Sequence, residues 1–239
     1  LLFGDRLAFT VDGLRIELLA AVGETVDCCV VWLPDHRVAL VSNLFGPLFP
    51  HFPNLNTIRG DKYRFVEPQL ATNRMVRELQ PEVLITGRHD PIVGAELIEA
   101  SLERLHDAVT YVHDRTLEGV NAGTDVWTLM REIQLPPELR VGQGYGKVAW
   151  GVRTLWESYV GWFKLQSTTE LYPDPAPAAL AELVDLVGTE ATLDRAEAAL
   201  VRGDAVVAIR LGEAVEAVVP DDARLRAVMA GAHRYLLDH

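Results

Sequence analysis

Two patterns of hydrophobic and polar residues divide the chain near residue 92. Before that point, short apolar runs alternate with turn residues, which is typical of strands. Runs of this kind predict strands over residues 7–11, 14–19, 28–33 and 38–41. Asp12-Gly13 separates the first two runs, and this dipeptide strongly favours a tight hairpin turn. We therefore expect the chain to open with a strand meander.

One helix and one further strand are expected before the pattern changes. Apolar residues near helical spacing predict a helix over residues 62–79, which Pro81 ends. Val83 to Thr86 predicts a short buried strand that leads into the loop of residues 87–91. The segment of residues 44–56 is rich in Pro, Phe, Asn and Gly and predicts a packed loop.

Beyond residue 92 the apolar residues recur with a helical period, and no further strand is expected. The predicted helices cover residues 95–119, 124–132, 148–160, 177–187, 191–202, 204–217 and 223–237. The last three are separated by Arg202-Gly203-Asp204 and by a turn containing Pro220. This punctuation, together with the small alanines, predicts tetratricopeptide-like helical hairpins.

Composition excludes several classes of protein. Hydrophobic residues make up 49% of the 239 residues, which is enough for a folded core. There are 34 acidic and 22 basic residues, giving a formal charge of −12 and no lysine or arginine run. Nucleic acid is therefore not an expected partner. No apolar stretch approaches the roughly 20 residues of a membrane helix, so no membrane span is expected.

The cysteines and the start of the chain bear on its context. Cys28 and Cys29 are adjacent in a strand-like run, so they are expected to be buried thiols and not a disulfide. This usage fits the cytoplasm, which is the expected location, and a periplasmic or secreted location is the alternative if an export signal lies upstream. The chain opens at Leu1 directly on strand-like sequence, and we expect that an upstream segment is absent.

Three residues are candidates for chemistry, each with an ordinary alternative. Glu24 lies in a turn between two strands, where it is either a metal ligand or a solvated charge. His89 follows a buried strand, at an edge where ligands gather, or is simply a surface histidine. Arg59 precedes Gly60, so its guanidinium either binds an oxyanion or pairs with the local helix.

Other motifs favour structural roles. His106 and His113 share a helix face, but no third ligand accompanies them, so helix packing or a subunit contact is favoured. The Gly-rich loop of residues 142–147 follows prolines and not a strand, which argues against a nucleotide loop. The sequence has no Gly-x-Ser-x-Gly motif, so serine hydrolase chemistry is disfavoured.

Several stretches together resemble one family. They are Leu33 to Leu40, Asn54 to Gly60, Leu105 to Ala108 and Tyr159 to Phe163, with Leu-Pro-Pro at 135–137 and Gly-Tyr-Gly at 144–146 between them. The combination resembles the alkylsulfatases of the metallo-β-lactamase superfamily. This resemblance implies an α+β chain in which residues 1–92 form the second half of a metallo-β-lactamase αββα sandwich. An all-α dimerisation domain would follow over residues 93–175, and tetratricopeptide-like hairpins over residues 176–239.

The resemblance implies a reaction and a cofactor. Members of this family are expected to hold two zinc ions that activate a water for attack on a sulfate ester. Their HxHxDH motif is absent from this sequence, so at least three metal ligands are expected to be missing and activity to require an N-terminal half.

The resemblance also implies roles for particular residues. Glu24 matches a metal carboxylate, whereas Asn43, nineteen residues on, stands where the family has a bridging carboxylate. His89 serves as the later histidine ligand unless Arg88 has replaced it. Arg59 and Tyr145 are expected to bind the substrate, with Arg59 gripping the sulfate group.

Three functional hypotheses follow. The first is a zinc-dependent sulfuric ester hydrolase that acts as a homodimer through its helical region. The second is a hydrolase of the same superfamily acting on another ester or thioester. The third is a non-catalytic dimeric scaffold with a decayed metal site, a hypothesis that the presence of Asn43 and Arg88 motivates.

Overall fold

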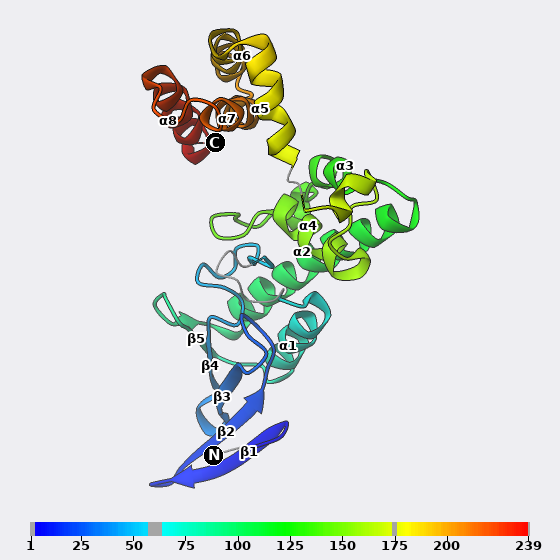
Figure 1. The fold of residues 1–239 in the computed structure, drawn as a ribbon. Coiled ribbons are helices and arrows are strands. Elements are labelled where there is room, and N and C mark those ends of the chain that lie inside the picture. The colour runs from blue at the N-terminus through cyan, green and yellow to red at the C-terminus, as the bar shows by residue number, and fades with distance from the viewer. Residues whose placement is uncertain (1–2, 57–63, 174–175, 239) are drawn as a thin grey trace. The chain divides into compact units, whose positions relative to one another are not determined.

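The computed structural model describes residues 3–56, 64–173 and 176–238, which form two compact units (Figure 1). The first unit spans Leu1–Lys164 and the second Leu165–His239. Within the described ranges, the first unit contains the strands and four α-helices, and the second contains helices without strands. The mixed α+β class predicted from the sequence is confirmed. None of the helices in the described ranges combines the length and hydropathy that a bilayer crossing needs.

One mixed sheet forms the base of the first unit. Its strands are β1 (Arg6–Val11), β2 (Leu14–Ala20), β3 (Cys29–Leu33), β4 (Val38–Ser42), β5 (Val83–Thr86) and β6 (Ile92–Val93). They are hydrogen-bonded in sequence order, and only β4 and β5 run parallel. Asp12 and Gly13 both have positive φ, at 49° and 85°. These values are those of the predicted two-residue hairpin turn between β1 and β2.

The sheet has one fully buried face and one half-buried apolar face. Val30, Trp32, Ala39, Val41 and Leu84 alternate along β3 to β5 and are buried in the main core. The residues between them point to the opposite face. There, cross-strand pairing places Leu18, Val31, Leu40 and Ile85 side by side in register. All four are only partly covered, so this apolar row has the character of a surface that packs against another layer.

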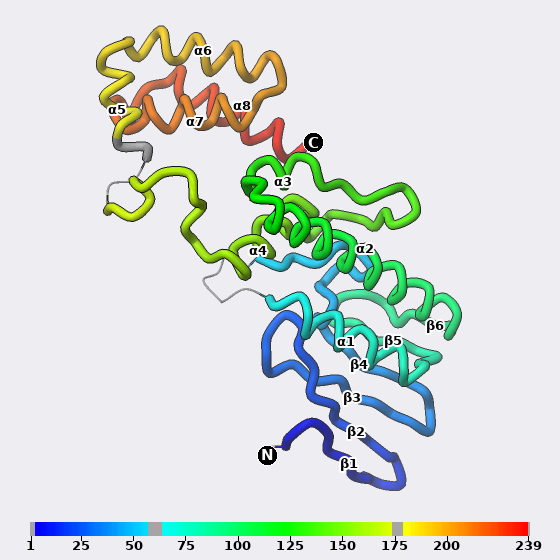
Figure 2. Tube along the Cα trace, turned by 90° about the vertical axis from the view of Figure 1, so that its right-hand side faces the viewer, coloured from blue at the N-terminus to red at the C-terminus, as the bar shows by residue number. Residues whose placement is uncertain are grey.

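Helices cover one side of the sheet. Those of the first unit are α1 (Val66–Glu78), α2 (Ala95–Asn121), α3 (Val126–Glu132) and α4 (Val148–Val160). Helix α1 is the crossover between the parallel strands β4 and β5, and it packs against α2 (Figure 2). Asp125 caps α3 by accepting hydrogen bonds from the backbone N–H groups of Trp127 and Thr128. Short 3₁₀ turns lie at Pro34–His36, Pro137–Leu139 and Thr168–Leu171.

The second unit is a stack of helices. They are α5 (Ala176–Val187), α6 (Thr189–Val201), α7 (Ala205–Glu216) and α8 (Ala223–Asp238). Helix α7 packs against α6 and α8, and its core contains the small residues Ala196, Ala199, Ala208 and Ala232. Small side chains allow the helix backbones to approach closely, as the sequence pattern predicted. Gly203, with φ of 85°, makes the sharp turn between α6 and α7.

Two expectations from the sequence are wrong. Strand structure continues to Val93, because Ile92–Val93 pairs with β5, whereas no strand was expected beyond residue 92. Two residues carry too short a pattern to be recognised. Cys28 and Cys29 are free but only half-buried, whereas they were expected to be buried. They lie where the loop of residues 21–28 joins the start of β3, and Cys28 Sγ lies 3.2 Å from the Thr25 hydroxyl.

Candidate functional site

Glu24 lies in the loop between β2 and β3, and a close backbone contact places this loop. A Cβ atom on Gly23 would come within 2.8 Å of both the Cα and the carbonyl oxygen of Leu44. Only glycine permits that approach. The turn that carries Glu24 is therefore pressed against the turn that follows β4, which contains Asn43 and Leu44.

Two side chains from distant parts of the chain converge on the Glu24 carboxylate. Arg64 Nη2 lies 3.2 Å from Glu24 Oε1, and the Tyr145 hydroxyl donates to the same oxygen over 3.1 Å. The side chain of Arg64 is 7% exposed and that of Glu24 is 18% exposed. An ion pair this poorly hydrated is screened much less than a surface pair. We call Glu24, Arg64 and Tyr145 the carboxylate cluster.

The guanidinium of Arg64 is also tied to the neighbouring loop. Its Nη1 donates to the backbone carbonyl of Asn54 over 2.7 Å, and its backbone N–H donates to Leu55 over 3.3 Å. Its Nε is buried without a hydrogen-bond partner among the described residues. Arg64 thus links the Glu24 turn to the loop before α1. No sequence pattern indicates a role for Arg64, since that role depends on a contact with a residue 40 positions away.

Tyr145 is positioned by the glycines on either side of it in the loop before α4. A Cβ atom on Gly146 would lie 2.2 Å from the carbonyl oxygen of Pro53, so this backbone packs directly on the loop of residues 44–56. Gly144 donates its backbone N–H to His51 Nδ1 over 3.1 Å. The tyrosine ring lies against Gly46. The Gly-Tyr-Gly motif therefore delivers a hydroxyl to Glu24.

Asn43 and His89 follow the two parallel strands β4 and β5 at the same edge of the sheet. Gly87 donates its backbone N–H to Ser42 over 2.9 Å, and a Cβ atom on Gly87 would meet Asn43 Oδ1 at 2.5 Å. Asn43 Oδ1 is buried and has no hydrogen-bond partner among the described residues. His89, two residues beyond Gly87, is exposed.

The structure describes the positions of four of the five predicted site residues. It joins Glu24 to Tyr145 directly and places Asn43 on the adjoining turn. His89 follows β5, the strand next to β4, but among the described residues no hydrogen bond or ion pair joins its ring to Glu24. Arg59 lies outside the described residues, so its position relative to the carboxylate cluster stays a prediction.

The donor set does not fit a zinc ion by itself. Zinc in proteins takes sulfur, imidazole and carboxylate ligands, commonly four in all. No three His, Cys, Asp or Glu side chains gather into a metal-binding group within residues 3–56, 64–173 and 176–238. Glu24 is already bound by two donors, and Asn43 supplies a neutral amide oxygen. These residues supply at most part of a metal site.

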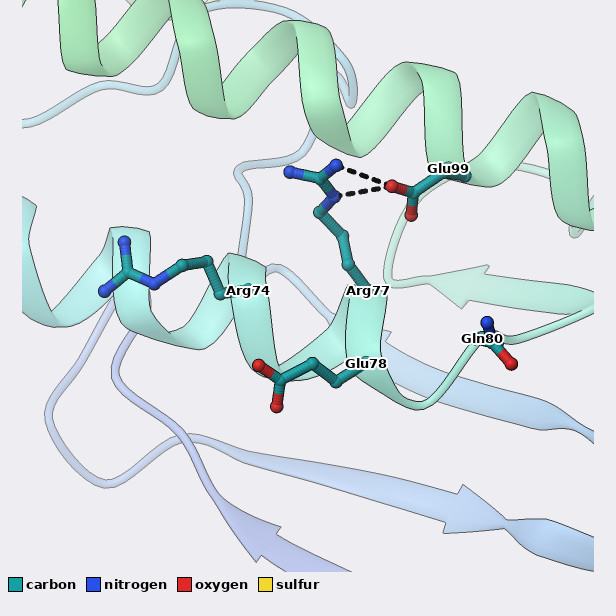
Figure 3. Close-up of a pocket in the computed structure, with 5 residues that line it drawn as sticks. All are labelled: Arg74, Arg77, Glu78, Gln80 and Glu99. Carbon is teal, nitrogen blue, oxygen red and sulfur yellow. Dashed lines mark hydrogen bonds and ion pairs between the residues drawn. The ribbon is translucent and has the colours of Figure 1, made fainter.

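A separate surface pocket lies between α1 and α2 (Figure 3). It has a volume of about 500 Å³ and is lined by Arg74, Arg77, Glu78, Gln80 and Glu99. The Arg77 guanidinium donates two hydrogen bonds to Glu99, which raise the pKa of Arg77 above its usual value. The Glu99 carboxylate therefore compensates the positive charge of the Arg77 guanidinium. Of the predicted site residues that the structure describes, Glu24, Asn43, His89 and Tyr145, none lines this pocket.

His113 takes part in helix packing. Its Nε2 lies 2.8 Å from the Tyr159 hydroxyl, which joins α2 to α4, and its Nδ1 lies 2.8 Å from Asp114. Burial raises the pKa of Tyr159. His106, seven residues earlier, lies 3.3 Å from Arg74 on α1 instead. The two histidines therefore serve separate contacts, as the packing interpretation expects.

Comparison with known proteins shows which family this chain resembles. Residues 127–238 match the family model described as alkyl sulfatase dimerisation. The chain is 31% identical to a linear primary-alkylsulfatase of a Pseudomonas sp. strain, over 98% of its own length and 45% of that relative. It is 26% identical to an alkyl/aryl-sulfatase of Saccharomyces cerevisiae, over 78% of this chain and 30% of that protein. The chain thus spans less than half the length of these curated relatives.

A solved structure shares the fold. The stereoselective inverting sec-alkylsulfatase Pisa1 from Pseudomonas sp. superimposes with a TM-score of 0.87 at 24% sequence identity. The match covers 98% of this chain and 38% of that one. The fold of this chain therefore also occurs as part of a larger protein.

Proposed function

This chain is a homologue of the alkylsulfatases and carries their dimerisation domain over residues 127–238, and from that premise we propose that it acts in the hydrolysis of sulfate esters. The family resemblance inferred from short motifs is confirmed by these matches. The proposed substrate is an alkyl sulfate, which would be split into an alcohol and inorganic sulfate.

The observation that carries the proposal is the carboxylate cluster. Glu24 and Tyr145 lie 121 positions apart in the sequence, yet their side chains are within hydrogen-bonding distance. Both were expected at the site from the family resemblance alone. Two independent glycine contacts, at Gly23 and Gly146, hold the backbone on each side of the pair. Such a constrained contact supports a site and not a chance surface pair.

Tyr145 would bind the sulfate group. A phenol carries one proton and donates one hydrogen bond. In the structure the Tyr145 hydroxyl donates this hydrogen bond to Glu24. A bound sulfate ester would replace Glu24 as the acceptor. The sulfate ester is an anion like the Glu24 carboxylate, so it can accept a charge-assisted hydrogen bond of the same kind. Arg59 would add its guanidinium to the same sulfate, as the resemblance implies.

Metal dependence, with zinc as the ion, is part of the proposal. Glu24 is the residue that would contribute a carboxylate, with Asn43 and His89 at the neighbouring strand ends. The sequence has no HxHxDH motif, so the ligands that such a motif supplies are not among these 239 residues. The described residues do not hold the ion alone. Their part is to bind and orient the sulfate group on one wall of the site.

The apolar row on the open face of the sheet supports this arrangement. Leu18, Val31, Leu40 and Ile85 stay half-covered in the described structure. In an αββα sandwich such a face packs on a second sheet. The row is therefore suited to the predicted half-sandwich.

The protein is also proposed to form a homodimer through residues 127–238. The match to a dimerisation family is the basis for this. Trp162 is 63% exposed, and Trp150, Leu171 and Tyr172 are also exposed in these residues. Large aromatic side chains are enriched at protein interfaces. Sedimentation should give twice the mass of one chain.

The two alternative functions are less favoured. A hydrolase for another ester or thioester would share the fold, but the relatives that align with this chain are named as alkylsulfatases. A decayed scaffold would keep the buried contact between Glu24 and Arg64 for stability, so this contact does not separate a scaffold from an enzyme. An assay separates the three possibilities.

The test is sulfate release from dodecyl sulfate by the protein that carries these residues, with and without a chelator. Release that the chelator abolishes and zinc restores supports the proposal. Hydrolysis of a thioester in place of the sulfate ester would favour the second function. Absence of any hydrolysis by a folded dimer would favour the scaffold.

A further inference from the structure

An apolar groove lies entirely within the second unit. Residues of helices α5, α6 and α7 line a space of about 450 Å³, a size suited to a small organic ligand. We call this space the helical groove. Leu180, Leu183 and Val187 line it from α5, and Val207 and Leu211 line it from α7.

The apolar wall is open to solvent. Leu183 is 55% exposed and Val187 is 61% exposed, and Leu180 and Val207 are exposed as well. Leu180, Leu183 and Val187 are spaced by three and four positions along α5, so they form one continuous stripe. Contiguous exposed apolar surface of this kind marks a binding site.

Two arginines also line the helical groove, and neither is neutralised. Arg195 on α6 and Arg210 on α7 have no ion-pair or hydrogen-bond partner within the described ranges. Acidic partners are plentiful in this chain, whose formal charge is −12. Arg224 in the same unit shows the contrast, since it binds Glu190, Asp194 and Glu197 at once.

We propose that the helical groove binds a single-chain anionic amphiphile, with its tail along the Leu and Val stripe and its acidic head on Arg195 and Arg210. A neutral lipid would leave both guanidiniums unused, and a small anion would leave the apolar wall wet. Only a ligand that combines the two features complements both surfaces. The groove contains none of the residues of the carboxylate cluster, so this binding does not depend on hydrolysis.

The experiment measures the affinity of the full chain for dodecanoate by titration calorimetry, below the micelle concentration. Dodecanoate carries no sulfate ester, so failure of the proposed hydrolysis does not affect the result. Octanoate and decanoate form a series in which each added methylene should tighten binding about threefold to fourfold. Dodecanol, which has no charge, should bind at least about tenfold more weakly than dodecanoate.

Matched variants locate the site. Arg195→Gln combined with Arg210→Gln should weaken dodecanoate binding about tenfold, whereas Arg234→Gln on α8 should not change it. Leu183→Gln should also weaken binding, whereas Leu186→Gln, on the same helix but outside the groove, should not. All five side chains are exposed, so these substitutions should not unfold the protein.

Several results would overturn the proposal. Affinity that is the same in the double arginine variant as in the parent chain would place the head elsewhere. Absence of binding, or equal loss in the Leu183 and Leu186 variants, would do so too. If Leu183→Gln converts a dimer into a monomer and the dimer binds no dodecanoate, the groove is covered by a second copy.

Discussion

The hydroxyl of Tyr145 donates a hydrogen bond of 3.1 Å to Oε1 of Glu24, across 121 positions of sequence. The same oxygen is paired with the buried guanidinium of Arg64. Three loops of the first unit thus meet at one carboxylate. Because the pair is poorly hydrated, its contribution to folding should be measurable.

The coupling between Arg64 and Glu24 should exceed that of a surface ion pair. In a double-mutant cycle with Arg64→Met and Glu24→Gln, we expect a coupling free energy of roughly 1–3 kcal/mol, since removing one partner leaves the other charge buried. Urea unfolding of the four proteins measures it.

The matched control is the exposed pair Arg115 and Glu118 on α2, whose side chains are more than half exposed. Its coupling should be at most about 0.5 kcal/mol. Equal coupling in the two cycles would mean that Arg64 and Glu24 form an ordinary surface pair.

The contact between Gly146 and Pro53 should be intolerant of even one methyl group. Gly146→Ala would bring its Cβ against backbone that cannot rotate away, so we expect a loss of roughly 1–3 kcal/mol in unfolding free energy. Gly4→Ala is the control, since no atom lies within 4 Å of its added Cβ. A shift in the urea midpoint that is no larger for Gly146→Ala than for Gly4→Ala would contradict the packing described.

The stability of the second unit should depend on pH through Arg224. The hydrogen bond from Arg224 lowers the pKa of Glu197 below its ordinary value of 4.5. A carboxyl group whose pKa is lowered by folding stabilises the protein above its unfolded pKa and loses that effect as the pH falls through the folded pKa. The ion pair between Arg224 on α8 and Glu197 on α6 should therefore weaken below about pH 4.5.

Arg224→Gln should reduce the difference in Tm between pH 7 and pH 3.5. Arg226→Gln should leave the difference unchanged, because among the described residues the ion-pair partner of Arg226 is a fully exposed Asp221. Thermal melts followed by circular dichroism compare the variants. If the Arg224→Gln protein kept the parent's full pH dependence of Tm, the ion pair between Arg224 and Glu197 would not contribute to stability.

The parts of the fold that could be predicted are those that local sequence patterns define. Strand alternation and the Asp12-Gly13 turn depend on neighbouring residues alone, and β5 and α4 have the predicted bounds. The pairing of Ile92–Val93 was missed, because a two-residue strand is defined by its partner and not by its own sequence. The half-exposure of Cys28 and Cys29 likewise depends on how the loop before β3 packs.

The candidate site divides in the same way. Short motifs identified Glu24 and Tyr145 as site residues through the family resemblance, but no motif indicated that they touch. Arg64 carried no signal, since an arginine before a predicted helix is common. Its role arises only when the turn at Gly23 and the loop at Gly146 close around it.

The central claim is that the carboxylate cluster faces the sulfate group of the substrate. The most direct measurement is the KM for dodecyl sulfate of the protein carrying these residues, before and after Tyr145→Phe, with Tyr172→Phe as the exposed control. We predict that KM rises about tenfold for Tyr145→Phe, through loss of a hydrogen bond to an anion, and stays constant for the control. A folded Tyr145→Phe protein with unchanged KM and kcat would contradict the account.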